Sequence, residues 1–160
     1  LLLQGYYYQF NWSLDYEYDV EEFSKYVQKA SEASSLEQKI SYLERVMGIY
    51  KGEFLAGIYD TWVLGHAQKY RNEYISSLMS LAQAKYSQEK FHEALKICYK
   101  ITEEDEFYEP AYRLAMKIHF SLGNKVGIVR QYEKCKQALL YEFDLKPSDL
   151  TENLYKELIK

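Results

Sequence analysis

Apolar residues recur at helical spacing through most of the chain. After Ser35, for example, Leu36, Ile40, Leu43 and Met47 are four, three and four residues apart, which places them on one face of a helix. Five further stripes follow, at Ile75, Leu78, Leu81 and Ala82; Phe91, Leu95, Cys98 and Ile101; Ala111, Ala115, Ile118 and Leu122; Ile128, Tyr132, Cys135 and Leu139; and Leu150, Leu154 and Leu158. With a helix from Asp19, the pattern predicts an all-α fold of about seven helices behind a short extended N-terminal segment.

Polar residues mark the expected starts of several helices. Asp19 with Glu22, and Asp149 with Glu152, have the spacing of a capping box, in which the two side chains satisfy backbone amides at a helix N-terminus. Ser35 is expected to cap the second helix. The acidic residues 103–106 are expected to precede a helix that starts near Phe107, because negative charge is favoured at that end.

A 34-residue offset relates two of the predicted helical hairpins. The offset superposes small and apolar residues on one another, with Leu81-Ala82 on Ala115-Met116 and Ala94-Leu95 on Ile128-Val129. A helix–turn–helix unit of this length resembles the tetratricopeptide repeat. The sequence therefore predicts a tetratricopeptide-like right-handed stack, and the alternative is two unrelated hairpins.

Stacked hairpins leave a concave groove, which the first helix of each pair lines. Exposed groups of those helices are expected to form a partner-binding groove of Met79, Gln83, Tyr86, Tyr112, Arg113, Met116 and Lys117. Aromatic residues, Met and Arg are enriched in interface cores. For Tyr86 and Met116, simple packing between repeats is an equally good interpretation.

Composition and charge exclude several classes of protein. The chain is 48% hydrophobic and 28% charged, which is unlike both disordered tails and membrane proteins. Its formal net charge of −4 argues against a nucleic-acid binder. The charge is also polarised along the sequence, because residues 111–140 hold six basic residues and one acid, whereas residues 1–60 hold five basic residues and ten acids.

The sequence contains no catalytic, cofactor-binding or metal-binding motif that we can identify. Phosphate-binding glycine loops, nucleophile elbows and metal-spaced cysteine pairs are missing. The three histidines, His66, His92 and His119, are scattered and are expected at the surface or in turns. Cys98 and Cys135 are expected to be buried free thiols in the reducing cytoplasm. We therefore expect no catalytic residues, cofactor or metal, and an enzyme is the least favoured function.

Three segments resemble the bacterial transcriptional activator domain (BTAD) of SARP-type and related bacterial regulators. Residues 49–57 read IYKGEFLAG and are followed by Trp62, which is similar to the hallmark turn of that family. Residues 132–148 are similar to its closing motif, and residues 19–23 to its opening helix. Asp144, where the family usually has Gly, and Thr61, where Pro or Asp is common, depart from the pattern.

The resemblance implies a non-catalytic effector or oligomerisation domain over residues 19–160. Residues 1–18 would then be a linker and the tail of a winged helix-turn-helix domain that lies upstream. Expected partners are that DNA-binding domain, a second copy of the chain and RNA polymerase, with DNA contacted only through the upstream domain. The alternative is a free-standing tetratricopeptide scaffold that binds a peptide or a partner protein, although Met79 and Gln83 stand where a carboxylate clamp needs Lys and Asn.

The hallmark turn is also expected to have a structural role. Gly52 is expected to end the preceding helix as a glycine C-cap. Phe54 and Leu55 are expected to fill the core beneath the turn, and Trp62 to be largely buried beside them.

Overall fold

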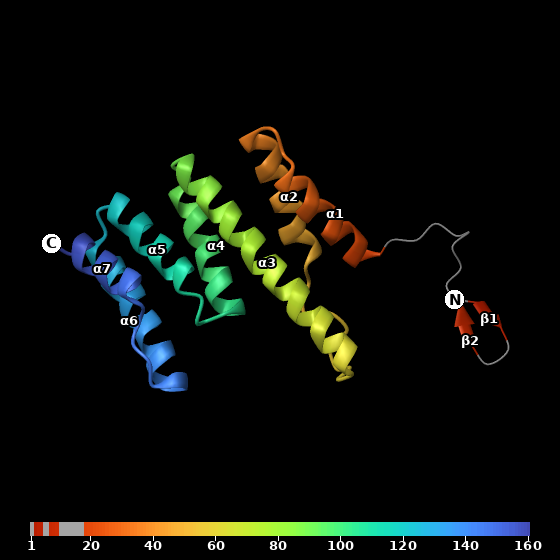
Figure 1. The fold of residues 1–160 in the computed structure, drawn as a ribbon. Helices are drawn as coiled ribbons and strands as arrows, with labels where there is room; N and C mark the ends of the chain where they lie inside the picture. Colours follow the sequence, from red (N-terminus) through yellow and green to blue (C-terminus); the bar gives the residue numbers. More distant parts are fainter. Residues whose placement is uncertain (1, 5–6, 10–17) are drawn as a thin grey trace.

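The computed structural model describes residues 2–4, 7–9 and 18–160. Two short strands precede seven helices (Figure 1). Their bounds are β1 (Leu2–Gln4), β2 (Tyr7–Gln9), α1 (Asp19–Ser31), α2 (Leu36–Ile49), α3 (Thr61–Ser87), α4 (Phe91–Glu104), α5 (Glu109–Ser121), α6 (Lys125–Phe143) and α7 (Asp149–Leu158). The all-α fold class and the number of helices are confirmed.

The strands form an antiparallel pair in which Leu3 lies opposite Tyr8. This pair is the part of the expected extended segment that the structure describes, because residues 1, 5–6 and 10–17 lie outside the described residues. No helix in residues 18–160 combines the length and apolar character needed to cross a lipid bilayer.

The helices stack as successive antiparallel pairs, α1 with α2, α3 with α4 and α5 with α6, and α7 packs on the last pair (Figure 1). The main core runs from α1 to α5 and includes the fully buried side chains of Tyr74, Leu78 and Ile101. Smaller buried clusters then join α5 to α6 and α7. Buried apolar residues therefore extend along the whole stack as one large cluster and two smaller ones, as expected for hairpins that cannot bury their apolar faces alone.

The 34-residue offset holds in three dimensions. Leu81 and Ala115, which the offset superposes, are both buried. The turns between the paired helices also match, because Glu89 and Gly123 occupy equivalent positions and both have left-handed backbone angles, with φ of 57° and 66°. The two hairpins are repeats of one unit.

Two of the three predicted N-terminal caps are wrong. Ser35 caps α2 as expected, since its hydroxyl accepts a hydrogen bond from the amide of Gln38 at 3.2 Å. Asp19, however, is the first residue of α1 and accepts only from the neighbouring amide of Val20. At α7 the N-cap is Ser148, and no side chain caps the helix there.

The acidic residues 103–106 precede a helix, as expected, but they do not directly adjoin its start. Glu103 and Glu104 form the last turn of α4, and the carboxylate of Asp105 accepts from the amide of Phe107 in the turn that follows. The next helix, α5, begins two residues later than expected, with Pro110 in its first turn, where no amide donor is needed.

The hallmark turn lies outside the core, which corrects three expectations. Leu55 and Trp62 are exposed, Trp62 with 58% of its surface, and Phe54 is only half-buried. Tyr50 stacks on the buried ring of Tyr74 at 3.9 Å between ring centroids, so these two rings pack in the core at this end and the side chains of the turn do not. Helix α2 also ends at Ile49 with Tyr50 as its C-cap, so Gly52, at φ 152°, serves the turn and not the helix end.

Candidate functional site

The structure divides the seven residues of the predicted groove into three groups. Gln83 and Lys117 are exposed, and Met79 and Tyr86 are half-buried. The hydroxyl of Tyr86 on α3 lies 3.4 Å from that of Ser121 on α5, so the two first helices meet at this point. These four residues are accessible to a partner, and their binding role stays a prediction.

Tyr112 and Met116 are buried, which contradicts their expected place on the groove wall. Tyr112 packs on Cys135 and Leu139, and its hydroxyl donates to the backbone carbonyl of Glu106 at 3.1 Å. Met116 is completely buried and packs against α6 and α7. For Met116 the structure supports the packing interpretation.

Arg113 takes part in a polar network that fixes the last helix, α7, on α5. Its guanidinium donates to the hydroxyl of Thr151 at 2.9 Å and lies 3.8 Å from the carboxylate of Glu109. Glu109 accepts from the backbone amide of Ser148 at 3.1 Å, from its hydroxyl at 2.7 Å, and from the hydroxyl of Thr151. Burial alone raises the pKa of Glu109, but these hydrogen bonds and the charge of Arg113 outweigh it and leave that pKa lowered. We name this network the α7 clamp.

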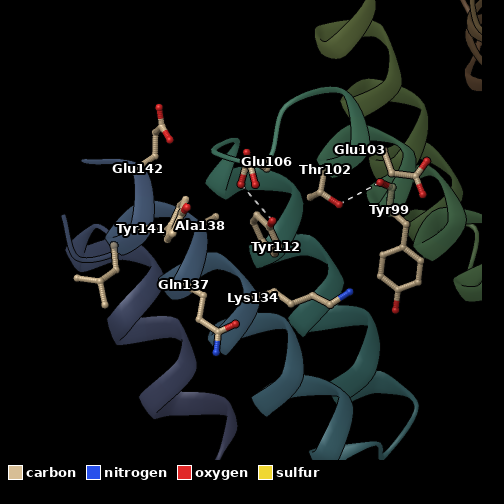
Figure 2. Close-up of a pocket in the computed structure, with 11 residues that line it drawn as sticks. Tyr99, Thr102, Glu103, Glu106, Tyr112, Lys134, Gln137, Ala138, Tyr141 and Glu142 are labelled. Atoms are coloured by element: carbon tan, nitrogen blue, oxygen red, sulfur yellow. Dashed lines mark hydrogen bonds between the residues drawn. The ribbon is translucent and has the colours of Figure 1, made fainter. Parts of the chain in front are cut away.

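A cleft of about 980 Å³ lies between α4 and α6 (Figure 2). Its walls carry residues from the C-terminal halves of these two helices, and Tyr112 of α5 lies at its floor. The lining combines tyrosines, carboxylates and one lysine: Tyr99, Thr102, Glu103, Glu106, Tyr112, Lys134, Gln137, Ala138, Leu140, Tyr141 and Glu142. We call this space the α4–α6 cleft.

A second cleft, of about 510 Å³, lies where the described helical stack begins. The first turn of α1, the turn between α2 and α3, and the start of α3 surround it. Its lining is mainly aromatic and includes Tyr18, Phe23, Tyr50, Phe54, Trp62 and Tyr70. Exposed apolar side chains continue beyond it at Ile58, Tyr59 and Leu64. We call this surface the aromatic cleft.

Two polar side chains are buried at equivalent positions of the repeat, and sequence reasoning identified neither. Lys85 lies in the last turn of α3 and contacts the carboxylates of Glu44 at 2.7 Å and Glu93 at 2.8 Å. His119 lies in the last turn of α5, 3.3 Å from both the hydroxyl of Tyr99 and the amide nitrogen of Asn124. The expectation of a surface or turn position is therefore wrong for His119, whereas His66 and His92 are exposed.

The physical states of the titratable groups do not favour catalysis. Burial raises the pKa of both cysteine thiols to about 12, so each is a neutral thiol and a poor nucleophile. The two are buried and unpaired, as expected. Burial, reinforced by the charge of Arg130, lowers the pKa of His119, but the ring faces protein groups on both sides. Within residues 18–160, no group of His, Cys, Asp and Glu side chains could hold a metal ion.

Comparison with known proteins places the helical stack in a family. The model of the bacterial transcriptional activator domain matches residues 18–159. No curated protein matches the chain in sequence. Among solved structures, the C-terminal TPR-containing domain of an FK506-binding protein from Plasmodium falciparum is similar, with a TM-score of 0.63 over 88% of both chains at 14% identity. That likeness concerns the fold alone.

The family match covers all seven helices, and its limits coincide with those of the stack. The exposed turn with Trp62 and the clamp residue Ser148 both lie in segments that the sequence singled out. The chain therefore belongs to the bacterial transcriptional activator domain family, folded as a tetratricopeptide-like stack of helical hairpins.

Proposed function

We propose that residues 19–160 are a non-catalytic protein-interaction domain of a bacterial transcription regulator, which binds DNA through a separate domain upstream. The observation that carries this proposal is the family match over the whole stack, together with accessible clefts that no described residue fills. Domains of stacked hairpins act by presenting such surfaces to other proteins. Residues 1–18 would then be the linker and the end of the upstream domain.

The aromatic cleft is the surface that we assign to the upstream DNA-binding domain. Tyr18 and Asp19 lie at its edge, so a domain joined to residue 18 emerges beside it. Trp62 lines the cleft and is largely exposed, and Tyr59 is exposed three residues before it in the chain. Large aromatic side chains often provide most of the binding energy of a protein interface. Self-association and contact with RNA polymerase would use other faces of the stack.

This assignment can be tested in the full-length regulator with exposed residues only. Replacing Tyr59→Ser together with Trp62→Ser removes aromatic surface without opening the core. We expect promoter occupancy to persist while transcription from that promoter falls several-fold. The matched control is Phe120→Ser with Val126→Ser, which removes two apolar side chains that are each more than half-exposed on α5 and α6. Normal transcription from the first variant, or an equal loss in the control, would contradict the assignment.

The proposal also predicts how residues 1–160 behave alone. Their net charge of −4 offers little for the phosphate contacts that dominate affinity for DNA. We expect no sequence-selective binding to the regulator's own promoter duplex at physiological salt, whereas the full-length protein binds it. Sequence-selective binding by this chain in a gel-shift titration would show that the domain itself contacts DNA, and the proposal would fail.

A further inference from the structure

We propose that the α4–α6 cleft binds an arginine-bearing, partly apolar segment of a partner protein. The proposed function enters only in the choice of a protein as the partner. The occupant is argued from the charge of the cleft, from the two helix ends that border it, and from its exposed aromatic surface.

The cleft carries unbalanced negative charge. Glu103, Glu106 and Glu142 line it together with a single cation, Lys134. Among residues 18–160, none of the three carboxylates has an ion-pair or hydrogen-bond partner. Figure 2 shows Lys134 and Gln137 at one end of the cleft and Glu106 and Glu142 at the other, so the lysine does not neutralise the acidic end.

Helix stability does not explain where these acids lie. Glu103 and Glu142 occupy the last turns of α4 and α6, where the helix dipole disfavours a carboxylate. Because α4 and α6 are both second helices of their pairs, they run in the same direction, and their carbonyl ends face the same edge of the stack (Figure 1). Two negative helix ends and three carboxylates therefore favour a cation at this place.

The molecule already satisfies one of these helix ends with arginine. The guanidinium of Arg71, on α3, donates to the backbone carbonyl of Glu104 at the end of α4. Arg71 does not line the cleft, so it leaves the cleft's carboxylates unpaired. A guanidinium from a partner would meet both helix carbonyls and carboxylate oxygens, which its planar fork of donors can bind two at a time.

The apolar part of the surface indicates a protein segment and not a free cation. Tyr141 is 93% exposed at the cleft, and Leu140 is half-exposed beside it. Arginine stacks on tyrosine rings as well as pairing with carboxylates, whereas lysine does so less well. Apolar residues next to the arginine would cover Leu140. Nucleic acid is disfavoured, because its phosphates would approach the three carboxylates.

The test uses residues 1–160 and a fluorescein-labelled peptide built from Arg-Leu-Leu-Arg repeats, followed by fluorescence anisotropy. Peptides of the same length built from Lys-Leu-Leu-Lys and Glu-Leu-Leu-Glu repeats are the comparisons. The protein variant replaces Glu103, Glu106 and Glu142 with Gln. The matched control replaces Glu22, Glu37 and Glu157 with Gln, three exposed glutamates outside the cleft, so both variants lose the same charge. Circular dichroism checks that each variant keeps its helices.

We expect the arginine peptide to bind more tightly than the lysine peptide and the glutamate peptide not to bind. The cleft variant should weaken arginine-peptide binding by about tenfold or more and the control by less than about twofold. Tyr141→Ser should also weaken it. An equal loss in the control would show general attraction to an acidic protein and overturn the proposal, as would lysine binding as tight as arginine binding.

The outcome is separable from that of the proposed function. The peptide measurement needs neither a promoter nor the upstream domain. Selective binding of the arginine peptide with a normal reporter result would overturn the assignment of the aromatic cleft and leave this inference standing. Loss of transcription in the aromatic-cleft variant, without any selective peptide binding, would support the assignment of the aromatic cleft and overturn the inference about the α4–α6 cleft.

Discussion

The two repeated hairpins fill the same buried space in chemically opposite ways. In the first, Lys85 points between two helices and pairs with Glu93, which begins the next helix of the unit. In the second, the equivalent residues are His119 and Gly127. A Cβ atom built on Gly127 would lie only 2.4 Å from Nδ1 of His119, so the ring occupies the space that a side chain would need.

The comparison shows that the repeat requires this space between the helices to be filled, but does not require particular residue types to fill it. A long cation with an acid, and a ring with no opposing side chain, both close the gap between the end of one helix and the start of the next. The first solution depends on charge and the second on packing. Substitutions at the two sites should therefore change the free energy of unfolding by different amounts, and these changes should respond differently to salt and to pH.

The largest effect is expected for Gly127→Ala. The added methyl meets the His119 ring, which Tyr99 and Asn124 hold in place, and overpacking of this kind costs about 1–3 kcal/mol. In a His119→Ala background the clash disappears, and alanine should then stabilise the helix by up to about 1 kcal/mol relative to glycine. Urea unfolding of the original protein, the two single variants and the double variant measures both the cost of the clash and the gain in helix stability. A neutral Gly127→Ala on its own would show that the ring moves aside easily.

A smaller effect is expected for Lys85→Met. Although Lys85 is buried, Glu44 and Glu93 are about half-exposed and can turn towards water, so the loss should be about 1 kcal/mol. Unfolding at low and at high salt separates charge from packing, because the part due to the ion pairs shrinks as salt rises. Lys96→Met, at an exposed position of α4, is the control. If salt does not change the loss of stability, the packing of the aliphatic part of Lys85 stabilises the fold and its charge does not.

The smallest effect is a pH dependence confined to the second hairpin. Burial, and next the charge of Arg130, lower the pKa of His119 below its usual 6.5. The unfolded chain therefore binds a proton more readily, and stability falls as pH drops below 6.5, at no more than about 1.4 kcal/mol per pH unit. The groups that face the ring are Tyr99, Asn124 and Gly127, and none of them carries charge there.

His119→Gln should remove this slope between pH 7 and pH 5, measured by thermal or urea unfolding. The pKa of Lys85 is raised, so its stabilisation is fully present below 10.5 and contributes no slope in this range. Retention of the slope in His119→Gln would assign it to another group.

Much of the fold could be predicted from periodicity and the 34-residue offset alone. The offset also indicates which residues of the expected groove are buried. It superposes Tyr112 on Leu78 and Met116 on Ala82, two positions that already belong to the apolar face, and this indicates burial for both. It likewise superposes His119 on Lys85, one turn beyond that face, which is the signal for a paired buried polar position.

Other features depend on contacts between distant parts of the chain, so local sequence patterns could not predict them. Arg113 is spaced to face outward on α5 and is covered only because α7 returns to it through the clamp. Leu150 continues an apolar stripe but is 71% exposed, because the clamp turns Thr151 inward instead. Trp62 and Leu55 lie outside the core, where they border the aromatic cleft, and which side of a turn faces the core is not encoded in its local pattern. The α4–α6 cleft joins residues from α4, α5 and α6 and from the turn after α4, which no local pattern predicts.

The packing of α7 on α5 affects the order in which the domain can be completed during synthesis. The face of α5 that carries Met116 meets Leu158 only after α7 has left the ribosome. Until then, α1 to α6 can assemble pair by pair, but the part of this face that α7 covers stays exposed. The polar bonds of Glu109 to Ser148 and Thr151 act at the very start of α7, so they can hold the helix on the nascent domain before its apolar residues have packed.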